Sequence, residues 1–105
     1  MRLRKESDDI HEDEIVLIAK VSDALAHPIR IKIFRFIMNC NAERVTVCNK
    51  DVVENFDYSQ GTISQHIKKL VQADLVQVKR KDSFSMYYVN IGVFSKYLDA
   101  VKKFE

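Results

Sequence analysis

Apolar residues recur at every third or fourth position in five stretches of the chain, and this spacing predicts five helices. Asp13 and Glu14 suit the positive end of the first helix, and Pro28 fits the first turn of the second. Asn49 and Ser59 are the expected N-caps of the third and fourth helices. We expect the helices at about residues 13–26, 28–38, 50–55, 60–73 and 91–105.

Two runs of alternating polar and apolar residues, 75–80 and 85–90, are joined by polar residues 81–84 and predict a β-hairpin. A β-branched run at 44–48, after a polar turn at 39–44, suits a short strand. The expected fold is therefore mainly α with a small β-hairpin. This order of elements is that of a winged helix-turn-helix, whose fourth helix here can enter the major groove of DNA.

The outer face of the fourth predicted helix carries amides, hydroxyls and amines but no carboxylate. Ile63, Ile67, Leu70 and Val71 take its buried side, while Gly61 permits close approach. Gln can bond adenine, Ser and Thr can reach base edges or phosphate, and Lys neutralises phosphate. The face therefore suits groove reading, with an ordinary solvated helix as the alternative. The candidate DNA-binding residues here are Ser59, Gln60, Thr62, Ser64, Gln65, His66, Lys68 and Lys69.

Further basic residues lie outside this helix. Lys79, Arg80 and Lys81 stand at the hairpin, where a wing lies along the DNA backbone or minor groove. The alternative is an edge hairpin that its charges keep soluble. The bases of the second helix are expected to face solvent: Arg30, Lys32 and Arg35.

Composition supports one ordered, helix-rich domain, because 47% of the 105 residues are hydrophobic and only 2 are Gly and 1 is Pro. We expect a flexible charged segment at 1–12 and a DNA-binding and dimerisation domain at 13–105. The net charge of +2 indicates little, but its distribution is uneven. Residues 6–14 hold acids without a base, whereas the bases of residues 59–81 face one acid, Asp74.

No apolar run reaches the roughly 18 residues that span a bilayer, and the amino-terminal residues lack the apolar core of a secretory signal. A cytoplasmic location is expected. In a reducing compartment Cys40 and Cys48 are expected to be thiols. They form a possible redox pair only if their α-carbons come within roughly 7 Å, which the sequence leaves open.

Four segments resemble the ArsR/SmtB family of repressors, and the likeness extends over about residues 20–90. The segments are 24–33, 51–56, 59–70 and 73–76. The Ser-Gln-x-Thr-x-Ser-x-His pattern that begins at Ser59 is the most specific part, and Leu-Ala-His-Pro-x-Arg from Leu25 supports it. The resemblance implies homodimers, built from the first and last helices, that bind operator dyads and release them when an inducer arrives.

The apolar pattern of the last helix agrees with a dimer, because its stripe is wider than one small core readily covers. A purely intramolecular core is the alternative. The candidate interface residues are Ile15, Val16, Ala19, Phe94, Tyr97, Leu98 and Val101.

Many members of this family sense metals, but the ligands that the resemblance requires are mostly missing. Cys48 stands where the family's thiolate cluster begins, whereas the later positions are Lys50 and Val53, which cannot ligate. The last helix offers Asp99 and Glu105 but lacks the histidine of the family's other site. No metal site and no cofactor is therefore expected.

The three histidines have less specific interpretations. His11 could join neighbouring carboxylates at a metal, although a flexible acidic tail is the simpler interpretation. His27 is expected to cap or pack, and His66 to pack or to contact a phosphate. The carboxylates near His11 are Asp8, Asp9, Glu12 and Asp13.

An enzyme is not expected, because the sequence suggests no nucleophile-base arrangement and no glycine-rich phosphate loop. The sequence favours a DNA-binding transcriptional regulator, a homodimeric repressor whose partner is double-stranded DNA. Its inducer, a small molecule or a redox signal, is not identified by the sequence. The alternative is a winged-helix module for protein interaction, because a fold alone does not fix function.

Overall fold

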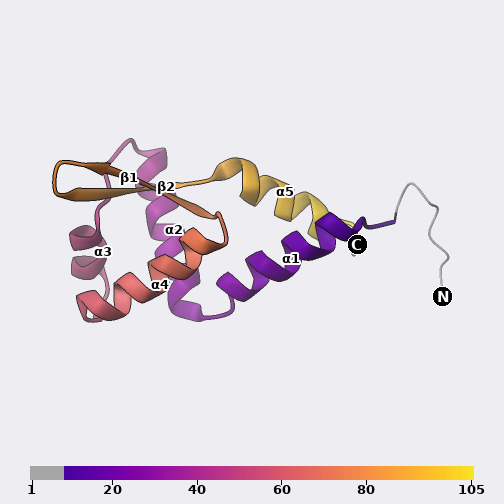
Figure 1. Cartoon of the computed structure of the whole chain (residues 1–105), viewed down its shortest axis with the longest axis horizontal. Helices are drawn as coiled ribbons and strands as arrows, with labels where there is room; N and C mark the ends of the chain where they lie inside the picture. The colour runs from indigo at the N-terminus through magenta and orange to yellow at the C-terminus, as the bar shows by residue number, and fades with distance from the viewer. Residues whose placement is uncertain (1–8) are drawn as a thin grey trace.

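A computed structural model describes residues 9–105, which form five helices and one two-stranded antiparallel sheet (Figure 1). The expected fold class and order of helices and hairpin are confirmed. The elements are α1 Glu12–Ala24, α2 Pro28–Ala42, α3 Asn49–Asn55, α4 Gln60–Gln72, β1 Val76–Lys81, β2 Phe84–Val89 and α5 Ile91–Lys102.

The core lies where α2, α3, α4 and the hairpin meet. Ile33 and Ile37 of α2 are fully buried with Ile63 and Leu70 of α4, and Leu75 closes the core before β1. Burying such a side chain stabilises a fold by about 1.5–3 kcal/mol. The core therefore includes the buried side of α4. Helices α1 and α5 pack on each other and form an arm that extends away from the hairpin (Figure 1).

Helix α2 is longer than predicted, since it continues to Ala42 and includes most of the expected polar turn at 39–44. One polar side chain of this last turn, that of Asn41, has partners in β2. Asn41 donates from Nδ2 to the carbonyl of Tyr87 at 3.3 Å and accepts from the amide of Val89 at 2.8 Å. The helix has ended before Arg44, whose backbone is in the left-handed region with a φ of 61°. Asn41 is therefore a link between α2 and β2.

The predicted strand at 44–48 is wrong, because only its end contacts the sheet. Tyr87 donates its amide to the carbonyl of Val47 at 2.9 Å, and Cys48 forms an isolated bridge with Met86. Helix α3 begins immediately afterwards, so no ladder can develop. Its N-cap is Cys48 rather than Asn49, and the Asp51 carboxylate accepts the Cys48 amide at 2.8 Å.

The amino-terminal segment 1–12 was expected to be flexible; residues 1–8 lie outside the described residues, and Glu12 already belongs to α1. Lys103, which follows α5, contacts the residues at and just before the start of α1. Its ammonium donates to the Glu14 carboxylate at 2.7 Å and to the carbonyl of Asp9 at 3.4 Å. Within residues 9–105, no helix is both long and apolar enough to cross a membrane.

Candidate nucleic-acid interface

Helix α4 is fixed at both its start and its buried side. As predicted, Ser59 is the N-cap, and its hydroxyl accepts the amide of Thr62 at 3.2 Å. Ile63, Ile67 and Leu70 are buried, whereas Val71 is only partly so. An ordered cap and a buried stripe fix the orientation of the helix, so that the same residues lie on its outer face.

The outer face of α4 is polar, exposed and free of carboxylates along its whole length from Gln60 to Gln72. The Ser64 hydroxyl also accepts a hydrogen bond from the side-chain amide of Asn49 at 3.1 Å, and this bond links α4 to α3. The nearest acid after the helix, Asp74, is paired with Lys20 at 2.7 Å, which offsets its charge. The candidate residues exposed on α4 and its cap are Ser59, Gln60, Thr62, Ser64, Gln65, Lys68 and Lys69.

His66 differs from these neighbours because it is half-buried and its Nδ1 accepts a hydrogen bond from Nε of Arg30 at 3.2 Å. The pKa of His66 is lowered by burial and then by the positive charges of Arg30 and His27. The expectation that Arg30 faces solvent is therefore wrong: it turns inward to α4. Its spacing to Ile33, Phe34 and Ile37, three, four and seven residues on, was the sequence signal for that orientation.

The wing carries its three basic residues on two faces. Residues of a strand alternate, so Lys79 and Lys81 project to one side and Arg80 to the other. The Lys79 ammonium lies 5.3 Å from the Tyr88 ring centroid, a cation–π contact that restrains it. All three are exposed. In Figure 1 the hairpin tip and the N-terminal end of α4 project toward the same end of the molecule, opposite the arm.

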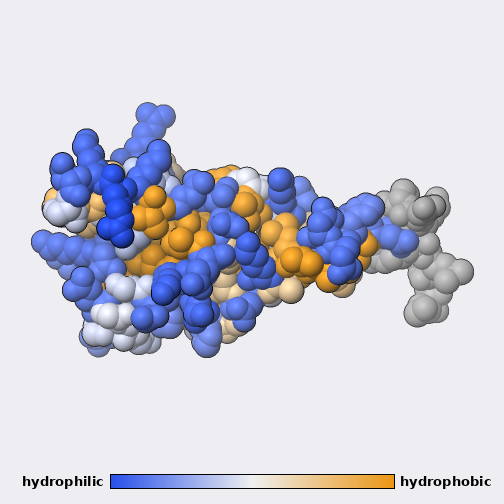
Figure 2. All heavy atoms as spheres, in the orientation of Figure 1, coloured by the Kyte–Doolittle hydropathy of each residue, from blue (hydrophilic) through white to orange (hydrophobic). Residues whose placement is uncertain are grey.

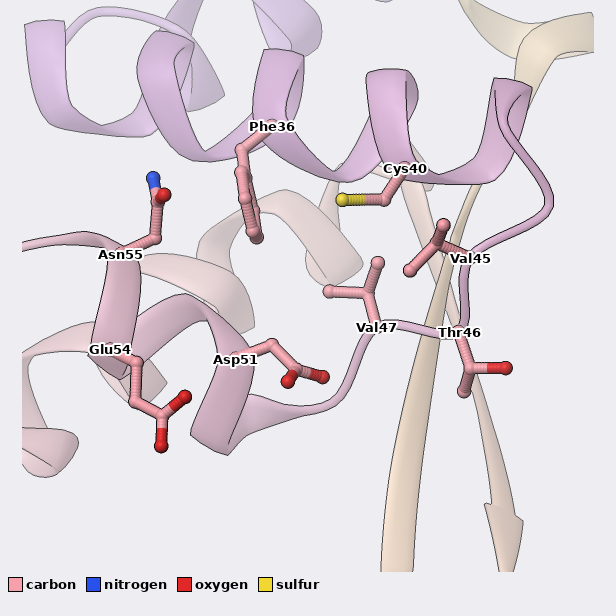
Figure 3. A pocket seen from close by; sticks show the side chains of 8 residues that line it. All are labelled: Phe36, Cys40, Val45, Thr46, Val47, Asp51, Glu54 and Asn55. Carbon is pink, nitrogen blue, oxygen red and sulfur yellow. The ribbon is translucent and has the colours of Figure 1, made fainter.

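A hollow of about 280 Å³ lies between α2, residues 45–47 and α3, and the Cys40 thiol lines it (Figure 3). The figure shows its sulfur pointing along the hollow toward Phe36. Burial raises the pKa of Cys40, helped by the negative charges of Glu43 and Asp51. The thiol is thus protonated at neutral pH and a poor nucleophile.

Cys48 lines a different hollow, beneath the wing, together with Phe84 and Met86. Its sulfur donates to the Asp51 carboxylate at 3.2 Å, and both cysteines are free thiols. Their possible redox pairing stays a prediction. Among residues 9–105, no group of three or more His, Cys, Asp or Glu side chains is arranged to hold a metal ion, and Asp8 lies outside the described residues.

The arm leaves apolar side chains on its surface, and Figure 2 shows hydrophobic residues exposed along it. Val16 is 56% exposed, and Phe104 at the end of the chain is 70% exposed. Among the candidate dimer residues, Phe94 and Tyr97 are partly buried, and Phe94 contacts Phe34 edge-on. The exposed candidates are Ile15, Val16, Ala19, Leu98 and Val101.

Comparisons with known proteins agree on one family. A family described as bacterial regulatory protein, arsR family, matches residues 27–78. The arsenical resistance operon repressor of Staphylococcus xylosus is 34% identical over 77 residues, which is 73% of this chain and 66% of that protein, just under two thirds of its length.

Solved structures share the fold at lower identity. An ArsR-like transcriptional regulator from Rhodococcus sp. RHA1 aligns with a TM-score of 0.72 at 17% identity, covering 86% of this chain and 80% of that one. NolR from Sinorhizobium fredii aligns with a TM-score of 0.65 at 21% identity, covering 99% of this chain and 96% of that one. The likeness thus extends over both the helix-turn-helix and the arm.

Proposed function

This chain belongs to the ArsR family of bacterial regulatory proteins, and from that membership we propose that it represses transcription as a homodimer that binds an operator dyad through α4. The observation that carries the proposal is the exposed face of α4, which offers hydroxyls, amides and amines and no carboxylate. A DNA phosphate repels carboxylates and attracts amines, so this composition suits the major groove.

Dimerisation through the arm supports the same function. An operator dyad presents two half-sites, and two copies of α4 related by a two-fold axis can read them together. The exposed apolar residues of α1 and α5 lie at the opposite end of the molecule from the wing tip, where a partner copy leaves α4 open (Figure 1). We place the repressor in the cytoplasm, where bacterial DNA lies, and give it a regulatory role without catalysis.

The inducing signal is proposed as a small molecule or a redox change rather than as a metal ion. The residues that would correspond to the family's thiolate cluster are Cys48, Lys50 and Val53, and the Cys48 thiol is already bonded to Asp51. A metal bound by such a cluster does not fit this site. A small molecule or a redox change at Cys40 or Cys48 remains the candidate signal.

The test of the DNA-reading role is Gln65→Ala, because Gln65 is exposed on α4 and its amide can bond one base pair bidentately. We expect a loss of about 1 to 3 kcal/mol on the specific operator, relaxed preference at one base pair and little change on random DNA. Fluorescence anisotropy on the two duplexes measures this. Equal weakening on both would show that Gln65 does not read a base, and Gln72→Ala on the last turn is the matched control.

A further inference from the structure

Arg30 is a half-buried cation with neutral partners. Its Nε donates to His66 Nδ1 at 3.2 Å, and its Nη1 reaches the carbonyl of Asp23 at 3.5 Å. None of the ion pairs within residues 9–105 includes Arg30, whose hydrogen bonds use Nε and Nη1. Because no buried side-chain nitrogen or oxygen of residues 9–105 lacks a partner, the Nη2 end of this guanidinium is open to solvent, where an anion can bind it.

His66 fixes the direction of this guanidinium. Because Nδ1 accepts the Arg30 proton, the neutral ring carries its own proton on Nε2, which adds a second donor. The His27 ring lies 6.4 Å from the His66 ring, centroid to centroid, and adds no negative charge. Asp23 accepts through its backbone carbonyl, and its side chain is exposed to solvent. The corner between α2 and α4 is therefore rich in donors.

The corner borders the reading face of α4. Thr62 lies four residues before His66 and Lys69 three residues after it, so the three follow one edge of the helix, the edge that faces α2. A helix is about 10–12 Å wide and the major groove about 12 Å, so the flanks of an inserted helix meet the sugar-phosphate backbone. Arg30 and Lys69 would both meet that backbone.

We propose that Arg30, oriented by His66, forms with Lys69 a binding site for one phosphate of the DNA backbone beside the groove that α4 enters. The proposal rests on the proposed DNA-binding function and adds a contact outside α4 and the wing. Arg30 binds the phosphate through its terminal nitrogens, and His66 is a positioning residue that keeps them pointed outward. The contact strengthens binding to every sequence, because phosphates carry no base identity.

The test compares Arg30→Gln with Arg35→Gln. Both remove one arginine charge from α2, but Arg35 is exposed and lies five residues further, on the other side of the helix. Affinity for operator and random duplexes is measured by fluorescence anisotropy between about 50 and 200 mM salt. Each phosphate contact contributes about 0.9 to the slope of log K against log salt, so a dimer that loses two contacts should lose about 1.8.

We expect Arg30→Gln to flatten the slope by that amount on both duplexes and Arg35→Gln to leave it unchanged. Equal slopes for the two variants would overturn the proposal, since the effect would then be one of general charge. If Arg30→Gln behaves as the wild type while Gln65→Ala still relaxes specificity, the phosphate site fails and the proposed function stands. If the wild type binds neither duplex, both fail.

The role of His66 is tested separately with two substitutions. His66→Asn keeps an acceptor near the Nδ1 position and should retain the wild-type slope, whereas His66→Leu removes it and should flatten the slope as Arg30→Gln does. Thermal unfolding of each variant is also recorded, so that salt slopes are compared only between variants that are folded. A wild-type slope in folded His66→Leu would overturn the positioning role.

Discussion

At the scale of single residues, three side chains of α4 and its cap are held by hydrogen bonds to neighbours. The Ser59 hydroxyl caps the first turn, Asn49 holds Ser64, and His66 faces Arg30. The exposed and buried faces of α4 follow from 3.6-residue spacing, so the sequence predicted both. The inward turn of Arg30 was not predicted, because a basic side chain is normally solvated and its partner lies 36 residues away.

His66 makes the stability of the fold depend on pH. Its pKa is lowered from 6.5 in the folded protein by burial and then by Arg30 and His27, so the folded state disfavours the imidazolium. The contribution of neutral His66 to the free energy of unfolding is therefore fully present above pH 6.5 and is lost as the pH falls below that value. We expect the free energy of unfolding of the wild type, measured in urea, to fall on acidification more than that of His66→Asn.

The Asn variant is the matched control, because it cannot take up a proton and leaves the other titrating groups unchanged. Glu14, whose pKa is lowered chiefly by the hydrogen bond from Lys103, loses its contribution only at lower pH, near and below 4.5. Parallel curves for wild type and His66→Asn down to pH 5.5, about one unit below the ordinary histidine pKa, would show that His66 does not cause this pH dependence.

At the scale of elements, the long periodic helices and the hairpin could be predicted from the sequence, while the ends of short elements could not. Asn39 and Asn41 suggest a turn, yet residues 39–42 continue α2, where Asn41 finds partners in β2. Residues 44–48 are β-branched and suggest a strand, yet only Val47 and Cys48 reach β2 before α3 begins. In both places a contact with β2, distant in sequence, decides the structure.

The wing is expected to strengthen DNA binding without reading sequence. Arg80 lies on the opposite face of β1 from Lys79 and Lys81, so its removal tests one face of the hairpin alone. We expect Arg80→Ala to lower affinity on operator and random duplexes alike and, because a dimer loses two contacts, to reduce the salt slope by about 1.8. Arg35→Ala, on α2, is the control for charge. A slope like that of the control would remove this face of the wing from the interface.

At the scale of the whole molecule, the arm is the feature that a monomer explains least well. The radius of gyration is 15.9 Å, against ~13 Å for a compact domain of 100 residues. Only two helices make up the arm, and both leave apolar side chains exposed (Figure 2). The sequence predicted this surplus of apolar surface from the stripe of α5, but which residues a partner covers depends on an interface that one chain does not contain.

A charge placed on the arm should therefore weaken self-association. We expect Val16→Asp to raise the dimer dissociation constant at least about tenfold, equivalent to about 1.4 kcal/mol, because the dimer would bury an unpaired carboxylate. Analytical ultracentrifugation over a dilution series measures this. Val45→Asp is the control, since Val45 is 50% exposed on the segment before α3. Identical dissociation constants, or a wild type that is monomeric throughout, would exclude the arm as the interface.

Whether α4 of a dimer reads DNA is tested by fluorescence anisotropy of the whole chain on its own upstream DNA and on a random duplex, with thiols reduced and salt fixed. We predict binding to the upstream duplex at least about a thousandfold tighter than to the random one. Equal affinity for the two duplexes, or no binding to either, would contradict this prediction and favour a winged helix that recognises another protein.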